Sequence, residues 1–515
     1  MTGRATFRES FLFGILSFGA LAVLGVASGI VIARAYGIEV VGAYALAYAP
    51  VGVCGTLSTM QEQAALVKEV AVLERRDPRI TGLFAAVSAF SAGLTLLVGT
   101  VTALISTWLL SGPIGRPDLV LPAIVLLVEF ALVSKVAWNL DWVFAAFRAG
   151  RQLFWIRLAH ALVYLAFVVG LSFVLDSVWA LVLGQVGAAV TSLVARLVVV
   201  RAFMRLRVGL GVLASGMREF PKVLKFGSKL AGGFVAEGAS VEAGTWLLGL
   251  TSSIAVVGAW NRAWQLVRRL MDPTYRVAEI LFPTLVERRS AGDRQGFDRA
   301  LLDSSRVVGA GLLLIAAVLG GAADGVMDLY GPGFDQAAPA LAMLLVVPAL
   351  YCLTTLQSQA LLAFDRPLTI TKITVTRAVI IVGGGVPLTL VMGLTGMALA
   401  TLVAYAVDLT WRVATTRRHL AVEGPLPWPL RTVLATVVAY AAGFGAARVI
   451  DAANDGAGGL LVALVAGSLA FFALFVLVGG LNDSDHRRLE TLAVRLRPRR
   501  SPVGGLAHPE PGATP

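Results

Sequence analysis

The sequence contains few charged residues and almost no cysteine. Charged residues make up 14% of its 515 residues, whereas soluble chains usually contain about 25%. The two cysteines, Cys54 and Cys352, both fall inside apolar runs, so they indicate neither a disulfide framework nor a metal site. A G-x-x-x-x-G-K-[ST] phosphate loop is also missing, which excludes ATP hydrolysis by that route. We therefore expect no cofactor and no bound metal.

Long apolar runs dominate the sequence. Hydrophobic residues make up 57% of the chain, and its mean hydropathy is +0.81. A helix needs about 20 apolar residues to cross the hydrocarbon core of a membrane. We count fourteen such runs, at 11–36, 41–66, 81–110, 119–147, 153–175, 178–204, 226–249, 254–284, 305–329, 337–363, 370–392, 395–416, 430–450 and 457–480. The sequence thus predicts an all-α polytopic membrane protein with about 14 transmembrane helices.

The basic residues gather in alternate loops between these runs. Arg75 and Arg288 lie in even-numbered loops, whereas the odd-numbered loops carry acids such as Asp118 and Asp324. Positive residues mark the cytoplasmic side of membrane proteins, so both termini are expected in the cytoplasm. The net charge of +12 is explained by this topology, and we expect no nucleic-acid partner.

Short phrases recur at a nearly constant distance along the chain. The Val-Gly-Ala at 41–43 recurs at 257–259, an offset of 216, and the Glu-Arg-Arg at 74–76 recurs at 287–289, an offset of 213. Each copy would contain six runs, so both copies enter the membrane from the same side. The sequence therefore predicts two six-helix bundles as parallel repeats, related by an axis along the membrane normal, plus a C-terminal helix pair.

The expected organisation has five parts. They are an N-terminal six-helix bundle at 1–204, a cytoplasmic linker at 205–225, a C-terminal six-helix bundle at 226–417, an additional helix pair at 430–480 and a basic tail rich in proline and glycine at 481–515.

Three stretches resemble a known family. They are "ARAYGIEVVGAYALA" at 33–47, "LFPTLVERRSAGD" at 281–293 and "LYGPGFDQAAPAL" at 329–341. Together with the two six-helix bundles, they resemble the multidrug/oligosaccharidyl-lipid/polysaccharide (MOP) exporter superfamily, in particular its polysaccharide-transporter or Wzx-like flippase branch. The resemblance covers about residues 8–420. The lipid II flippases of the same superfamily, which also have fourteen helices and a cationic cavity, remain a close alternative.

The resemblance implies a function and a location. It implies that an undecaprenyl-pyrophosphate-linked oligosaccharide is moved from the inner to the outer leaflet of a bacterial cytoplasmic membrane, for cell-surface polysaccharide biosynthesis. The partners would be the lipid-linked glycan and membrane lipids, with polysaccharide polymerase and glycosyltransferases as further candidates.

Charged residues inside the runs are the candidate site, because a charge at the centre of a span costs about 2.5–3.5 kcal/mol. Arg262, Arg269 and Arg276 are seven residues apart, so they drift only about 40° around one helix. An arginine fork suits a diphosphate. The substrate-binding candidates are Arg34, Lys135, Trp260, Asn261, Arg262, Trp264, Gln265 and Arg269. The alternatives are arginines that extend to the membrane interface, or a structural ion pair at Arg262.

Acids inside the runs are the candidates for coupling or gating: Glu129, Glu237 and Glu242. Glu242 and Arg262 are expected at similar depth, and we predict that they pair and that the pair can change partner when an anion, proton or sodium ion binds. A fixed structural bridge is the alternative. Arg377 and Asp408 are expected to pair in the second bundle.

Four functions compete. The leading hypothesis is a flippase that works by alternating access, and a lipid II-type flippase is its close relative. A multidrug or cation antiporter would need an acidic cavity, which the arginines disfavour. An enzyme acting on lipid-linked sugars would need a substantial outward loop, whereas no predicted outward loop exceeds about a dozen residues. A non-transporting scaffold remains open.

Overall fold

The computed structural model describes residues 7–60, 66–67, 69–70, 73–75, 77–147, 149–204, 209–419, 430–454 and 456–481. Nearly all of the predicted tail and residues 205–208 of the predicted linker lie outside this part. The described secondary structure is helical and contains no strand, which confirms the predicted fold class. The helices are α1 (Phe7–Leu57), α3 (Pro78–Ser111), α4 (Val120–Glu129), α5 (Lys135–Ala146), α6 (Gly150–Ser172), α7 (Val178–Val200), α8 (Leu210–Thr251), α9 (Ile254–Met271), α10 (Pro273–Ser290), α11 (Arg294–Gly321), α12 (Ala323–Asp328), α13 (Ala338–Leu344), α14 (Val347–Ala363), α15 (Pro367–Arg417), α16 (Leu430–Ala453) and α17 (Gly456–Leu477).

Ten helical stretches in the described residues are long and apolar enough to cross a membrane. Two of them contain two arms each, because α1 bends at Gly37 (φ 73°) and α15 at Gly393 (φ 56°). Glycine adopts positive φ readily. With each arm taken as one span, and with α8 and the consecutive α9 and α10 added, the helices correspond to all fourteen predicted spans.

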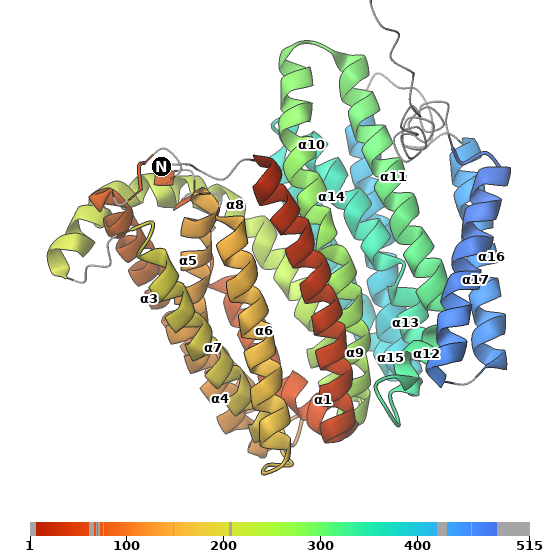
Figure 1. Ribbon diagram of the computed structural model, residues 1–515, viewed down its shortest axis with the longest axis horizontal. Helices are drawn as coiled ribbons and strands as arrows, with labels where there is room; N and C mark the ends of the chain where they lie inside the picture. The colour runs from red at the N-terminus through yellow and green to blue at the C-terminus, as the bar shows by residue number, and fades with distance from the viewer. Residues whose placement is uncertain are drawn as a thin grey trace, which may run out of the picture.

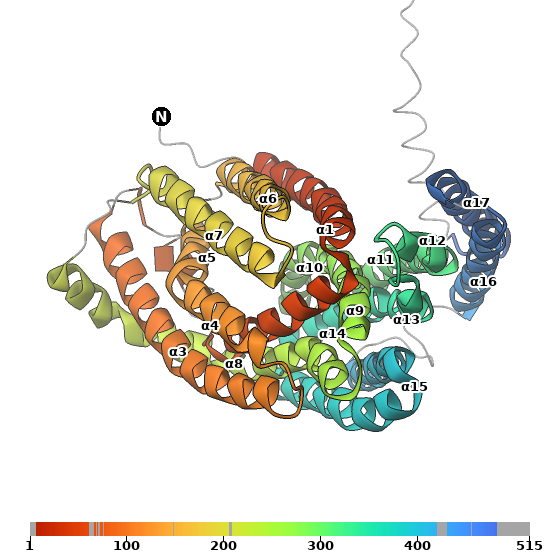
Figure 2. The ribbon, with the colours of Figure 1, turned by 90° about the horizontal axis from the view of Figure 1, so that it is seen from below.

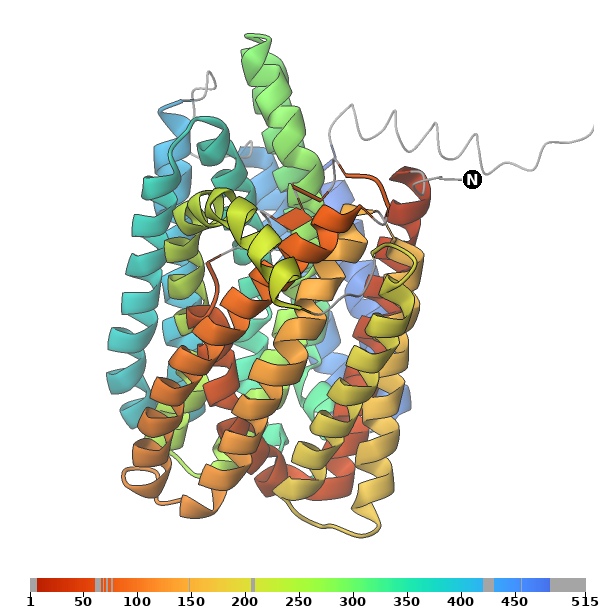
Figure 3. The ribbon, with the colours of Figure 1, turned by 90° about the vertical axis from the view of Figure 1, so that its left-hand side faces the viewer.

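The helices form two groups and an appended pair (Figures 1 and 2). Helices α1 and α3–α7 lie on one side, α9–α15 lie on the other, and α16 and α17 pack beside α11 at the far edge. Figure 3 shows the helices of the first group side by side. We call the end of the bundle at which α1 bends the Gly37 end; it is the lower end in Figure 1. Helix α1 begins and α17 ends at the opposite end.

The repeated Val-Gly-Ala phrases meet at the boundary between the two groups. A Cβ atom added to Gly42 would lie 2.1 Å from the carbonyl oxygen of Ile254, and one added to Gly258 would lie 2.3 Å from that of Ile38. Both glycines therefore allow two backbones to approach closely. Residues 38 and 254 also differ by 216, so each copy presents the same two positions to the other. Such reciprocity is the mark of a two-fold relation, as expected for parallel repeats.

A buried arginine recurs in the two copies at the same register. Arg196 Nε donates to Asp141 at 2.6 Å, and Arg412 Nη1 donates to Ser358 Oγ at 2.5 Å. The arginines differ by 216 positions and their partners by 217. In the second copy the acid has moved to Asp408, one turn before Arg412, with which it pairs. The copies thus share the position of the cation but not that of the anion.

Candidate functional site

Helix α9 presents a polar stripe on an otherwise buried helix. It begins after Ser253, whose hydroxyl accepts from the Val256 amide at 3.4 Å. Gln265, Arg268 and Arg269 are exposed and Asn261 is half-buried. Spacings of three, four and seven residues place these side chains along one side of the helix.

Arg262 is a buried cation that has no counterion in the part of the chain that the structure describes. Its side chain is 6% exposed, and Nη1 donates to Gln265 Oε1 at 3.2 Å. Nε has no hydrogen-bond partner, and no carboxylate of the described residues pairs with Arg262. The ionisable groups that interact with it are the phenols Tyr44, Tyr164 and Tyr330. Because an uncompensated charge inside a membrane protein is costly, this position favours the binding of an anion.

Two arginines of α9 lie against the first arm of α1. A Cβ atom added to Gly29 would lie 3.7 Å from Arg262 Nη1 and 3.4 Å from the Tyr330 ring, and one added to Gly25 would lie 3.2 Å from Arg269. These glycines leave room for the guanidinium groups. The structure thus brings Arg262 and Arg269 together at the boundary between the two copies. The side chain of Arg276, the third arginine of the predicted stripe, lies outside the described residues.

Glu242 pairs with a different arginine from the one predicted. Its Oε1 lies 3.5 Å from Arg268 Nη1, and its carboxyl packs on Gly52 of α1, where an added Cβ atom would lie 2.5 Å away. The predicted Glu242–Arg262 pair is therefore wrong in this conformation. The prediction counted residues from the outer ends of two helices and assumed that both helices have the same tilt. The observed partner, Arg268, lies six residues further along α9 than Arg262. The sequence could have indicated Arg268, because its spacing from Asn261 and Gln265 places all three side chains along one side of α9.

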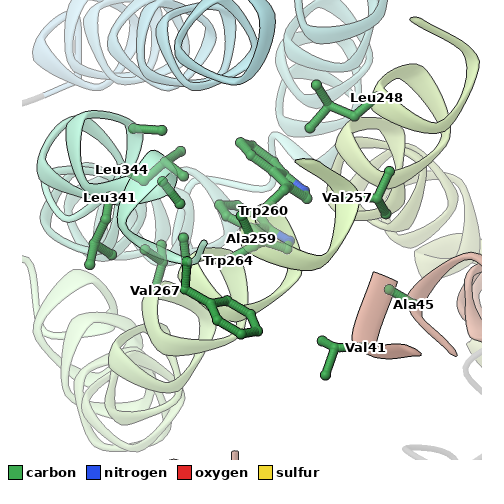
Figure 4. Packing of buried hydrophobic residues seen from close by; sticks show 14 of the residues in the cluster. Val41, Ala45, Leu248, Val257, Ala259, Trp260, Trp264, Val267, Leu341 and Leu344 are labelled. Atoms are coloured by element: carbon green, nitrogen blue, oxygen red, sulfur yellow. The ribbon is translucent and has the colours of Figure 1, made fainter. Parts of the chain in front are cut away.

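The two tryptophans of α9 are core residues. Trp260 is 1% exposed and Trp264 5%, and their rings stack with centroids 5.8 Å apart. Trp264 Nε1 donates to the Val241 carbonyl at 3.1 Å. Figure 4 shows both rings in the same apolar cluster as Leu341 and Leu344 of α13. They are buried here and are not available to sugar rings.

The remaining basic candidates hold segments of the fold. Arg34 Nε donates to the Leu329 carbonyl at 2.8 Å and so joins α1 to the segment after α12 across the two copies. Lys135 is fully buried, and its Nζ donates to the carbonyl of Ser58 at 3.2 Å, just beyond the end of α1.

Glu237 belongs to a charge network in the second copy. It contacts Arg377, which also donates to Asp408 at 3.0 Å, so the predicted Arg377–Asp408 pair is confirmed. Arg377 is buried and lies 4.4 Å from the centroid of the Tyr405 ring. The network connects α8 to both arms of α15.

Glu129 differs from the other acids in the spans. It is 5% exposed and accepts a hydrogen bond from Ser134 Oγ at 2.5 Å. A π-helical turn at Phe130–Ser134 brings this hydroxyl, five residues later, beside the carboxyl. Among the described residues, Glu129 has no arginine or lysine partner, whereas Asp141, Glu237, Glu242 and Asp408 each have at least one.

Comparison with solved structures identifies the fold. The chain is similar to the lipid II flippase MurJ in an inward closed conformation, with a TM-score of 0.65, 13% identity, and coverage of 93% of this chain and 100% of that one. It is also similar to an inward-facing multidrug resistance MATE family transporter of the MOP superfamily (TM-score 0.56, 14% identity, coverage 78% and 95%). It is similar as well to a mutant of the Vibrio cholerae MATE transporter VcmN, with a TM-score of 0.54, 14% identity, and coverage of 81% of this chain and 97% of that one. At such identities the likeness shows the fold alone.

The sequence itself matches one family model. The model is described as "Polysaccharide biosynthesis protein", and it covers residues 7–287, more than half of the chain. A comparison with curated proteins gives no match. The chain is thus a multi-pass membrane protein that belongs to the polysaccharide biosynthesis protein family, and it has the fold of the MurJ flippase and of a MATE transporter of the MOP superfamily.

Proposed function

We propose that this protein moves an undecaprenyl-pyrophosphate-linked oligosaccharide from the inner to the outer leaflet of a bacterial cytoplasmic membrane. The single observation that carries the proposal is Arg262, a buried cation at the boundary between the two copies that has no counterion among the described residues. The family description supports a role in polysaccharide biosynthesis. A diphosphate is the kind of group that a guanidinium binds with paired hydrogen bonds.

In this mechanism Arg262 and Arg269 hold the diphosphate, and the glycan follows it between the two copies. A charge pair at 4 Å is worth about 4 kcal/mol at an effective dielectric of 20, which offsets part of the cost of dehydrating the headgroup. Arg34 and Lys135 have structural contacts in this conformation and would act on substrate only in another one.

The Gly37 end is the outer end in this proposal, and both termini lie in the cytoplasm. The Gly42–Gly258 contact and the Arg34–Leu329 bond hold the two copies together there. Release to the outer leaflet requires that these contacts break while the opposite end closes. The structure then corresponds to a state closed toward the outside, which is one half of an alternating-access cycle.

The acids supply candidate coupling and gating groups. Glu129 has no cationic partner among the described residues, so binding a proton would remove an isolated charge from the membrane interior. An anion that reaches Arg268 would compete with Glu242 for this arginine. Glu237 is less suited to such an exchange of partners. Its partner Arg377 also pairs with Asp408, so an incoming anion would have to compete with two carboxylates.

A lipid II-type flippase is the second candidate. It is favoured by the structural likeness to MurJ, which extends over 93% of this chain. Lipid II also carries a diphosphate, so Arg262 would act in the same way and the glycan would distinguish the two functions. Multidrug export is the less favoured alternative, because Arg262 would repel a cationic drug.

The test compares the leaflet distribution of lipid-linked glycans in cells. Cells that lack the protein should accumulate these lipids in the inner leaflet, and the native chain should relieve the accumulation whereas Arg262→Ala should not. Rescue by Arg262→Ala would contradict the role of this arginine. If deletion changed no lipid-linked glycan, the proposed function itself would be wrong.

A further inference from the structure

An apolar cavity lies between the second arm of α1, α8 and the first arm of α15. Its volume is about 270 Å³. The lining residues are Val53, Thr56, Leu57, Val235, Glu242, Ala243, Trp246, Leu247 and Val382. Glu242 is the only charged side chain among these lining residues, and the wall is otherwise almost entirely apolar. A cavity with this lining fits a hydrocarbon group better than a sugar or an ion.

Glu242 connects this cavity to the polar stripe of α9. Glu242 lines the cavity, and its Oε1 lies 3.5 Å from Arg268 Nη1. Arg268 is 51% exposed, and Arg269 follows it directly on the same stripe. Gly52 packs against the carboxyl from the other side. A cationic surface and an apolar cavity therefore share one wall.

We propose that this cavity binds the first hydrocarbon units of the transported lipid while the diphosphate of the same molecule, which Arg262 and Arg269 hold, also contacts Arg268. This inference rests on the proposed function and adds a subsite to it. A soluble anion would leave the cavity unused, and a neutral hydrocarbon would leave the arginines unused. An amphiphile with an anionic head next to a single chain uses both.

The size of the cavity limits how much of the chain it holds. Sites for whole drug-sized ligands measure about 300–1,000 Å³, and this cavity is smaller. It therefore takes only the part of the chain nearest the diphosphate, and the remainder extends into the bilayer. The occupant is the transported prenyl lipid rather than a bulk phospholipid, whose headgroup carries two chains.

Glu242 couples the two parts of this subsite. In the structure it is the partner of Arg268, so a diphosphate that binds this arginine displaces a carboxylate. The same residue also lines the cavity that the chain fills. Binding of the head and of the chain therefore acts on one side chain, which makes a complete prenyl diphosphate a better ligand than either of its parts.

The test compares two probes on the full-length protein in phosphatidylcholine nanodiscs: inorganic diphosphate and farnesyl diphosphate. Each buried methylene raises affinity about fourfold, so the native protein should bind farnesyl diphosphate at least about tenfold more tightly. Val382→Phe fills the cavity from a half-exposed position (43% exposed). This variant should bind farnesyl diphosphate at most about twofold more tightly than inorganic diphosphate. Its affinity for inorganic diphosphate should equal that of the native protein.

Val379→Phe is the matched control. It lies one turn earlier on α15, is 63% exposed and does not line the cavity. It introduces the same ring into the same bilayer, so it should retain the full advantage of the farnesyl chain. Partition of the probe into the nanodisc affects all three proteins equally.

Three outcomes would overturn the inference. They are equal affinity of the native protein for both probes, an unchanged advantage in Val382→Phe, and loss of the advantage when phosphatidylglycerol is added in excess, which would assign the cavity to bulk lipid. If the native protein bound neither probe, the proposed anion site would fail along with its subsite.

Discussion

At the scale of single residues, the spans use charge in two ways. Most of their acids are paired with arginines that fix helices to one another, as Asp141 is with Arg196 and Asp408 is with Arg377. Arg262 and Glu129 have no such partners among the described residues. Paired charges hold a structure, whereas unpaired ones are available to a ligand, and this difference separates the structural candidates from the functional ones.

The network around Asp408 should be important for stability. Asp408→Asn leaves Arg377 and Arg412 without their shared acid, and the loss of one partner of a buried pair costs about 3–5 kcal/mol. Thermal unfolding in detergent measures the effect. Asp118→Asn is the control, because Asp118 is 57% exposed and pairs with Arg116 at the surface, where a pair is worth about 0–1 kcal/mol. Equal losses in the two variants would contradict the structural role of the network.

Glu129 should set the pH dependence of transport. Glu129→Gln keeps the size of the side chain and its hydrogen bonds but removes the ionisable group. We expect a folded protein whose initial rate of translocation no longer varies with pH between about 5 and 8. The readout is that rate in proteoliposomes of fixed lipid composition. A pH profile identical to that of the native protein would exclude Glu129 as the coupling group.

At the scale of helices, glycine decides where elements approach. Gly37 and Gly393 divide α1 and α15 into two arms each, and Gly42 and Gly258 bring the second arm of α1 against α9. Apolar periodicity predicts a span but not its tilt or rotation, and those two quantities decide which side chains meet. For this reason the arginines of α9 could be found from the sequence, whereas the predicted partner of Glu242 was Arg262 instead of Arg268.

Replacing Gly258 with a residue that has a side chain should separate the two copies at the Gly37 end. Its Cβ atom would lie 2.3 Å from the Ile38 carbonyl, so Gly258→Leu should shift the protein away from the closed state. The measurement is the yield of a cross-link that a bifunctional thiol reagent forms between Arg34→Cys and Leu329→Cys, two positions that the Arg34–Leu329 hydrogen bond joins in the native protein. We expect the ratio of cross-linked to free protein to decrease about fivefold or more, since a shift of about 1 kcal/mol changes an equilibrium constant by that factor.

Gly311→Leu is the control for that experiment. No atom outside its own turns of α11 lies within 4 Å of a Cβ atom added at Gly311, so the added side chain should leave the yield of the cross-link unchanged. A similar yield in Gly258→Leu and Gly311→Leu would mean that the glycine contact does not control the Gly37 end.

At the scale of the whole molecule, the duplicated chain explains much of the architecture. The fourteen spans and the parallel repeat could be predicted, because apolar runs and repeated short motifs can be recognised directly in the amino-acid sequence. The symmetric contact of Gly42 with Gly258 and the paired registers of Arg196 and Arg412 could not, since they require three-dimensional packing. The burial of Trp260 and Trp264 was missed for the same reason: periodicity places them on α9 but does not show that α13 covers them.

The two copies share a backbone and differ in charge. The first copy has Leu46 where the second has Arg262, and Asp141 where the second has Ser358. In the proposed function, the symmetric frame supplies two halves that rock about one axis, and the asymmetric charges supply a single anion site between them. This combination is what the transport of one anionic lipid at a time requires.

The most direct test of this account is translocation of an undecaprenyl-diphosphate-linked oligosaccharide in proteoliposomes, followed with an impermeant glycosidase added outside. The native protein should expose the inner-leaflet pool to the enzyme. Arg262→Ala should slow this exposure about 10- to 100-fold, as expected for the loss of a charged hydrogen bond worth about 1.5–3 kcal/mol, and Arg299→Ala, at an exposed surface position, should not. No exposure by the native protein, or equal rates for native protein and Arg262→Ala, would contradict the account.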